Sequence, residues 1–202
     1  MHAPNDSRWR RGHSPRFCYT RLVPGIVSLL SEQHDHCVRR LWEALEREFA
    51  CPPQPEGAIP HMSYHVATAY DWAGLEPVLA GIAASEPPAQ TETHGLGIFN
   101  GEPAVLYLAV TRSPALTRLH AHVTAAADRF AGGQQDYFHE RRWAPHITLA
   151  ITSLDAGAAA EAVIWLHRQP LAWEFAADNL AVMDDGGGRH SLLARYPFAA
   201  AR

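Results

Sequence analysis

The segments Pro60-His61-Met62-Ser63 and Pro145-His146-Ile147-Thr148 decide the fold, because they are two versions of one pattern. Each sets a histidine two residues before a hydroxyl side chain, in a stretch whose pattern predicts a β-strand. Residues i and i+2 of a strand point to one face, so each segment presents an imidazole together with a hydroxyl. Two such faces across a cleft would supply a base, an acid and two hydrogen-bond donors, a set that suits chemistry at a phosphodiester.

The elements predicted around the two segments follow one order. Helical periodicity and capping residues predict four helices, which begin at Ser31 or Asp35, at Asp71, at Pro114 and at residue 154. The third is expected to end at Gly132-Gly133. Alternating stretches predict two hairpins, formed by 91–99 with 104–110 across Asn100-Gly101 and by 171–183 with 191–198.

Helix, histidine-bearing strand, helix and hairpin therefore occur twice. We predict an α+β, duplicated, two-lobed fold, with antiparallel-rich sheets around a central cleft and helices on the outer faces. The pseudo-repeats span roughly 32–111 and 114–199, within one domain of residues 23–199. Residues 1–22 carry five arginines against one aspartate, which predicts a mobile basic arm that either touches an RNA backbone or is simply unstructured.

Composition limits the possible functions. A net charge of -4 over 202 residues argues against a general polyanion binder, so any nucleic-acid contact should be local. The sequence contains no apolar run of about 18 residues, so no membrane span is predicted, and no apolar signal core is found at the N-terminus. The three cysteines form no C-x-x-C pair, which favours a reducing compartment. We expect a cytoplasmic protein.

All 17 basic residues are arginine. A Walker A loop needs a lysine, as does a ligase that forms a lysyl-nucleotide intermediate, so both mechanisms are excluded for this chain acting alone. Arginine remains as the side chain that grips phosphate oxygens.

The histidine–hydroxyl pattern is weak by itself, and His122-Val123-Thr124 matches it as well. That third match lies in a predicted helix, where residues i and i+2 diverge, so we reject it. The other two share a preceding proline, a strand and an equivalent place in the repeat. The competing interpretation is that His61 and His146 are two independently buried histidines.

At this point the chain resembles a known family. Its second segment, RRWAPHITL at 141–149, is similar to the most characteristic stretch of the two-histidine (2H) phosphoesterase superfamily. In particular, it resembles the bacterial RNA 2′,3′-cyclic phosphodiesterases, also called 2′-5′ RNA ligases. PHMSY at 60–64 and the hairpin 97–107 also resemble family segments, and the resemblance covers roughly 22–198. Ile151 departs from the pattern, since many relatives carry an arginine there.

The resemblance implies that His61 and His146 share general acid and base catalysis, for which imidazole is suited. It implies that Ser63 and Thr148 donate hydrogen bonds to phosphate oxygens. No metal and no cofactor is expected. The implied substrates are 2′,3′-cyclic phosphate ends of RNA or small nucleotides, with ATP-independent 2′-5′ ligation as the reverse reaction. We expect a monomer.

Further substrate-binding candidates precede the second segment. Arg141 and Arg142 either steer phosphate or are surface charges, and Tyr137 and Trp143 either stack on a base or pack in the core. His65 is expected on the face of His61, at the rim of the cleft.

Three other functions stay open. The substrate could be another phosphodiester, such as a cyclic nucleotide, a 2′-5′ oligonucleotide or an ADP-ribose cyclic phosphate. The chain could instead be a non-catalytic RNA- or nucleotide-binding module. The high histidine count alone would fit a metal-binding regulator.

Overall fold

The computed structural model describes residues 24–152, 156–184 and 189–199, so the predicted arm 1–22 lies outside the described residues. The helices are α1 (Glu32–Phe49), α2 (Trp72–Ser85), α3 (Pro114–Ala127) and α4 (Ala156–His167), with a 3-10 turn η1 (Asp136–Phe138). The strands are β1 (Gly25–Leu29), β2 (His61–Tyr70), β3 (Ala89–Phe99), β4 (Ala104–Val110), β5 (Ala131–Gln134), β6 (His146–Thr152), β7 (Glu174–Ala177), β8 (Asn179–Asp184) and β9 (Ser191–Pro197).

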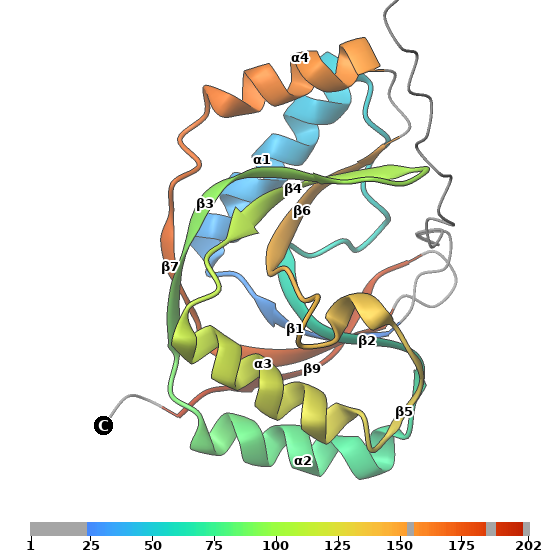
Figure 1. Ribbon diagram of the computed structural model, residues 1–202, viewed down its shortest axis with the longest axis vertical. Helices are drawn as coiled ribbons and strands as arrows, with labels where there is room; N and C mark the ends of the chain where they lie inside the picture. Colours follow the sequence, from blue (N-terminus) through green and yellow to red (C-terminus); the bar gives the residue numbers. More distant parts are fainter. Residues whose placement is uncertain (1–23, 153–155, 185–188, 200–202) are drawn as a thin grey trace, which may run out of the picture.

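The strands form one curled sheet in the order β7-β3-β4-β6-β2-β1-β8-β9, and β5 pairs with β2. Every pair of named strands is antiparallel. Helices α1 and α4 lie together at one end of the sheet, and α2 and α3 lie together at the other (Figure 1). This arrangement confirms the predicted α+β class with antiparallel strands and outer helices. None of the described helices is long and apolar enough to cross a membrane.

Two helices begin at predicted capping residues, and the third begins at Pro114 as predicted. Ser31 accepts a hydrogen bond from the amide of His34, Asp71 caps α2, and Ser113 caps α3 directly before Pro114. Each side chain satisfies one amide that the first turn leaves unpaired. The choice between Ser31 and Asp35 for α1 is thereby settled in favour of Ser31.

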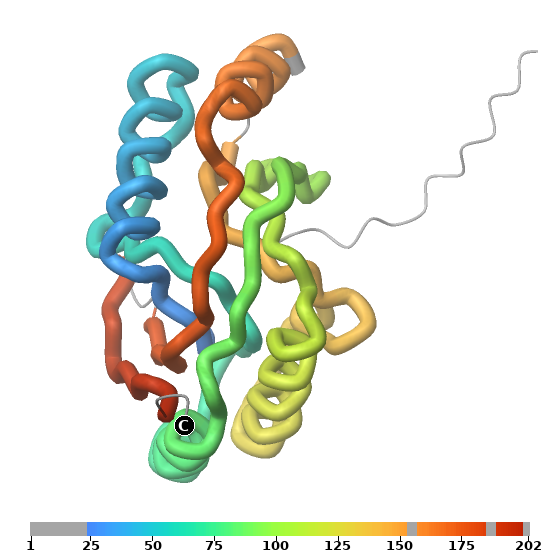
Figure 2. Tube along the Cα trace, turned by 90° about the vertical axis from the view of Figure 1, so that its left-hand side faces the viewer, coloured from blue at the N-terminus to red at the C-terminus, as the bar shows by residue number. Residues whose placement is uncertain are grey.

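Two predicted boundaries are wrong because tertiary pairing overrides the local signal. The third helix ends at Ala127, and Gly132-Gly133 belongs to β5, where Gly132 pairs with Ala69. The predicted strand 171–183 is two strands, since β7 pairs with β3 while β8 pairs with β1 and β9. Figure 2 shows β7 running beside β3.

The sheet buries one set of alternating side chains in the main core, which includes Met62, Leu108 and Ile147. A second cluster forms around Val27 and Leu29 of β1 with Ala181 and Met183 of β8. Since Leu29 pairs with His61 and Val27 with Ser63, this second cluster lies on the face of β2 that carries the first motif. It gives that motif an apolar floor.

Candidate active site

The two motif strands meet at one residue pair. Within the described residues, β2 and β6 pair only at Met62 and Ile147, and both side chains are buried in the core. Because side chains alternate along a strand, the residues on either side of this pair share the opposite face. Those residues are half-buried, and they are His61, Ser63, His146 and Thr148.

Extended by one residue on each side of the Met62–Ile147 pair, the antiparallel register sets His61 across from Thr148 and His146 across from Ser63. The two histidines are diagonal neighbours, which in an antiparallel pair lie about 7–8 Å apart. The predicted gathering of two imidazoles and two hydroxyls on one face is therefore present in the structure. Charge on His146 lowers the pKa of His61, as expected for two rings that face one site.

The two histidine rings are anchored in the same way. Nδ1 of His61 donates to the carbonyl of Ile59, and Nδ1 of His146 donates to the carbonyl of Ala144, each at 2.7 Å. A carbonyl can only accept, so each neutral ring carries its proton on Nδ1 and keeps a lone pair on Nε2. The proline between anchor and histidine fixes its own φ and restricts the backbone of the anchor residue before it, which helps turn the anchor carbonyl toward the ring.

Burial keeps both rings neutral near pH 7. It lowers the pKa of His61 to about 4, against the hydrogen bond to Ile59, which raises it, while charge on His190 and His146 lowers it further. Burial also lowers the pKa of His146, against the raising effect of its bond to Ala144. The site therefore presents two unprotonated Nε2 atoms until a negative charge arrives to favour the imidazolium form.

Two tryptophans support the strands that carry the motifs. The indole Nε1 of Trp143 donates to the carbonyl of Ser63 at 2.9 Å, and that of Trp42 in α1 donates to the carbonyl of Thr148 at 3.0 Å. The carbonyl of each hydroxyl residue is thus satisfied by an indole where β2 and β6 stop pairing.

An aromatic wall, Phe99 with Tyr107, borders His146. The two rings stack with centroids 4.1 Å apart, and they approach the His146 ring at 4.9 and 5.2 Å. Tyr107 pairs with Thr148 across the sheet, and its ring lies over Gly97, where a Cβ atom would clash with it. Sequence reasoning missed this wall, because only the hairpin register brings the rings to the site.

A third imidazole lies near the first motif. Charge on His190 lowers the pKa of His61, and the backbone amide of His190 donates to the carbonyl of Glu56 at 2.9 Å. The ring nitrogens of His190 are shielded from solvent. No sequence pattern pointed to it, since it lies far along the chain and belongs to neither motif.

A family profile described as the 2′-5′ RNA ligase superfamily matches residues 31–189. The chain belongs to the 2′-5′ RNA ligase superfamily. TT0787 of Thermus thermophilus is similar in structure, with a TM-score of 0.63 and 16% identity over 90% of this chain and 100% of that chain. E. coli LigT complexed with ATP gives 0.55 and 16% identity over 88% and 98%. A search of curated proteins gave no match.

The superfamily assignment confirms the resemblance to the two-histidine phosphoesterases, and the similar structures confirm the fold class. Neither comparison identifies a substrate for this chain. Within the described residues of this superfamily member, no three histidine, cysteine or acidic side chains gather as a group that could hold a metal ion.

Trp143 corrects the sequence prediction for a substrate-binding residue. Its side chain is 3% exposed, so its ring cannot receive a nucleobase. It stacks instead on His120, with centroids 3.8 Å apart and an interplanar angle of 9°. Trp143 therefore acts behind the strand, through its bond to Ser63.

In this member of the 2′-5′ RNA ligase superfamily, the substrate-binding roles of Arg141, Arg142 and Tyr137 stay predictions. The Arg142 guanidinium lies over the Tyr137 ring, 4.8 Å from its centroid, and Tyr137 is half-buried. Arg141 and Arg142 are both exposed. This places charge on the surface next to the second motif without showing contact with the two histidines.

His65 does not share the face of His61. Val27 pairs with Ser63 and Ile26 with His65, so Tyr64 is an extra residue in a β-bulge that breaks the alternation. His65 is 2% exposed. Its Nδ1 meets the Tyr70 hydroxyl at 2.6 Å, and its Nε2 meets the Asp128 carboxylate at 3.0 Å.

Proposed function

We propose that this protein is a metal-independent phosphodiesterase that hydrolyses 2′,3′-cyclic phosphate ends of RNA or small nucleotides. The observation that carries the proposal is the matched presentation of two Nε2 atoms on one face, each with its Nδ1 anchored to a backbone carbonyl. Neutral imidazoles held in one tautomer are suited to take up a proton at one atom and release it from the same atom.

In the proposed reaction, one imidazole Nε2 accepts a proton from water as the water oxygen forms a bond to phosphorus. The bond from phosphorus to one ribose oxygen breaks, and the second imidazole, as its imidazolium, donates a proton to that oxygen. The product is a phosphomonoester. The hydroxyls of Ser63 and Thr148 donate hydrogen bonds to the non-bridging oxygens, where charge builds in the transition state.

The negative charge of the substrate determines which histidine acts as the acid and which as the base. Both rings have lowered pKa values, so a phosphodiester anion between them favours protonation of the ring that faces the leaving oxygen. The other ring stays neutral and serves as the base. Either histidine could hold either role, depending on which way the substrate lies.

Two further observations support a nucleotide as substrate. Crystal structures of LigT were determined with ATP, with 3′-AMP and with phosphate. In this chain, the half-buried rings of Phe99 and Tyr107 border His146, and stacking of a base on such a ring is worth about 1–3 kcal/mol. ATP-independent 2′-5′ ligation would be the reverse reaction, in keeping with a chain that has no lysine.

The test is turnover in the presence of EDTA, using 2′,3′-cyclic mononucleotides, a cyclic-ended oligonucleotide and 2′-5′-linked dinucleotides. We expect hydrolysis of cyclic phosphates, and a loss of about two orders of magnitude or more in His61→Ala and His146→Ala. His122→Ala is the matched control, because this third histidine–hydroxyl match lies in α3 and its ring pairs with Glu86. It should keep full activity.

The other outcomes are equally informative. Turnover of only the linear or 2′-5′-linked substrates would transfer the same chemistry to another phosphodiester. Binding without turnover would indicate a non-catalytic nucleotide-binding module. Activity that depends on an added metal ion, or that survives in either histidine variant, would contradict the mechanism.

A further inference from the structure

One face of helix α1 contacts the second motif strand and the segment that precedes the first. Asp35, Arg39 and Trp42 stand at i, i+4 and i+7, so they line up along the helix. Trp42 bonds the carbonyl of Thr148 in the second motif. Arg39 reaches the other way and donates from Nη1 to the carbonyl of Ala58, three residues before His61, at 3.0 Å.

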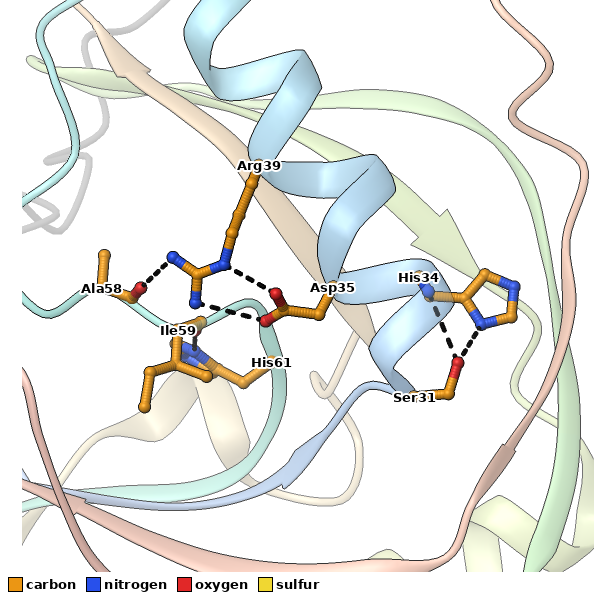
Figure 3. A network of polar contacts seen from close by, with 7 residues as sticks. All are labelled: Ser31, His34, Asp35, Arg39, Ala58, Ile59 and His61. Carbon is orange, nitrogen blue, oxygen red and sulfur yellow. Dashed lines mark hydrogen bonds and ion pairs between the residues drawn. The ribbon is translucent and has the colours of Figure 1, made fainter.

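The guanidinium of Arg39 is held in a defined position. Its Nε and Nη2 donate to the two carboxylate oxygens of Asp35 at 2.6 and 3.3 Å, and its Cζ lies 5.9 Å from the centre of the Trp42 ring. A two-point fork of this kind fixes the plane of the guanidinium. The third nitrogen is therefore aimed at Ala58, as Figure 3 shows.

Ala58 is directly followed by the residue that anchors His61. The carbonyl of Ile59 accepts from Nδ1 of His61 at 2.7 Å (Figure 3). Only two backbone torsions separate consecutive carbonyl groups, so a hydrogen bond that holds Ala58 also restricts the direction of the Ile59 carbonyl. The contacts form one path from Asp35 through Arg39 and the 58–59 segment to the imidazole.

We propose that Arg39, oriented by Asp35, is a positioning residue that keeps the His61 ring directed for proton transfer by holding the 58–59 segment. This inference rests on the proposed role of His61 as an acid or base. Arg39 acts through the backbone and need not touch the substrate. This role differs from that of Arg141 and Arg142, which are candidates either for steering phosphate or for surface charge.

The test compares Arg39→Gln, Arg39→Lys and Asp35→Asn with Arg40→Gln. Arg40 is exposed on the same helix, so its variant removes an equal charge without touching the path. Steady-state rates are measured with a 2′,3′-cyclic mononucleotide, and long-range 1H–15N spectra report the His61 tautomer, with His61→Gln used for assignment.

For Arg39→Gln we expect kcat to fall between about tenfold and a hundredfold with KM within about twofold, because small misplacements of a reacting group cost rate. The Nδ1–H form of His61 should lose population. Asp35→Asn should change both readouts in the same direction. Arg39→Lys should lie between, since an ammonium can reach Ala58 without forming the two-point fork. Arg40→Gln should match the unmodified protein.

Two results would overturn the proposal. A raised KM with unchanged kcat would make Arg39 a substrate-binding residue, and unchanged kcat, KM and tautomer would remove it from the site. If the unmodified protein hydrolyses no phosphodiester, the proposed function fails, yet the tautomer measurement still decides whether Arg39 positions His61. If Arg39→Gln does not fold, Asp35→Asn and Arg39→Lys give the same readouts.

Discussion

The indole of Trp143 offers a sharp test of how the site is supported. Trp143→Phe keeps an aromatic ring against His120 but removes the Nε1–H group that donates to the Ser63 carbonyl at 2.9 Å. A buried carbonyl left without a donor costs about 1–3 kcal/mol. We therefore expect the free energy of unfolding to fall by about 2 kcal/mol, and the thermal midpoint by about 4–8 °C for a chain of this size.

Trp173→Phe is the matched control. The indole of Trp173 also donates to a carbonyl, that of Pro170 at 2.8 Å, but this bond is exposed to solvent. Water replaces an exposed partner, so the loss should stay within about 0.5 kcal/mol. Trp42→Phe, which frees the carbonyl of Thr148, should resemble Trp143→Phe.

The assay is urea unfolding followed by far-ultraviolet circular dichroism, because tryptophan fluorescence changes with the substitution itself. Linear extrapolation gives the free energy of unfolding of each variant. We also expect kcat to fall in Trp143→Phe, since Ser63 loses its support. Equal losses in Trp143→Phe and Trp173→Phe, or no loss in Trp143→Phe, would refute the bracing role.

Three further predictions follow from the site and its surroundings. Sulfate, whose charge is fixed near pH 7, should bind with uptake of a proton, because an anion raises the lowered pKa values of the two site histidines. Calorimetry in buffers of different ionisation enthalpy measures the number of protons taken up, and sulfate binding without proton uptake would contradict the prediction. His120 is fully buried, and burial lowers its pKa to about 4. Its contribution to stability is therefore complete above the unfolded pKa of about 6.5 and is lost as pH falls toward 4, by up to about 3 kcal/mol. Urea titrations at stepped pH should show that the free energy of unfolding changes less with pH in His120→Gln, and an unchanged pH dependence would contradict the assignment. Gly97→Ala should displace the Tyr107 ring, lower the free energy of unfolding by about 1–3 kcal/mol and raise the KM for nucleotides. Gly132→Ala, with open space at its Cβ, is the control. Equal KM values in the two variants would show that the aromatic wall does not bind the base.

Local signals in the sequence predicted the motifs, the helix starts and the first hairpin. Strand alternation places His61 with Ser63 and His146 with Thr148 on one face, and the pairing of Met62 with Ile147 joins the two faces. The capping side chains were readable because the amides they satisfy are close in sequence.

What could not be predicted depends on contacts between distant segments. A β-bulge at Tyr64 turns His65 into the protein, and a bulge leaves no dependable mark on a single sequence. The Gly132-Gly133 pair looks like a helix end but forms a strand, because β2 offers it backbone partners. Phe99 and His190 reach the site only through the register of a hairpin and the path of a long connection.

The proline that helped to distinguish the two motifs from the third match has a second meaning. A proline precedes both motif histidines, and the carbonyl before each proline turned out to hold the ring. The repeated proline therefore marks a repeated anchor as well as a repeated strand. The shared proline therefore indicates the tautomer of both imidazoles, which the hydroxyl two residues later does not.

The single residue pair that links β2 and β6 has a consequence for how such a site can change. Because one pair joins these two strands, the distance between the imidazoles depends on how β2 and β6 lie relative to each other, and the indoles of Trp42 and Trp143 hold both strands from outside the reacting centre. Substitutions far from either ring can therefore widen or narrow the opening while the proton donor and acceptor stay the same. Selectivity for the bulk of the esterified group can drift independently of the catalytic pair.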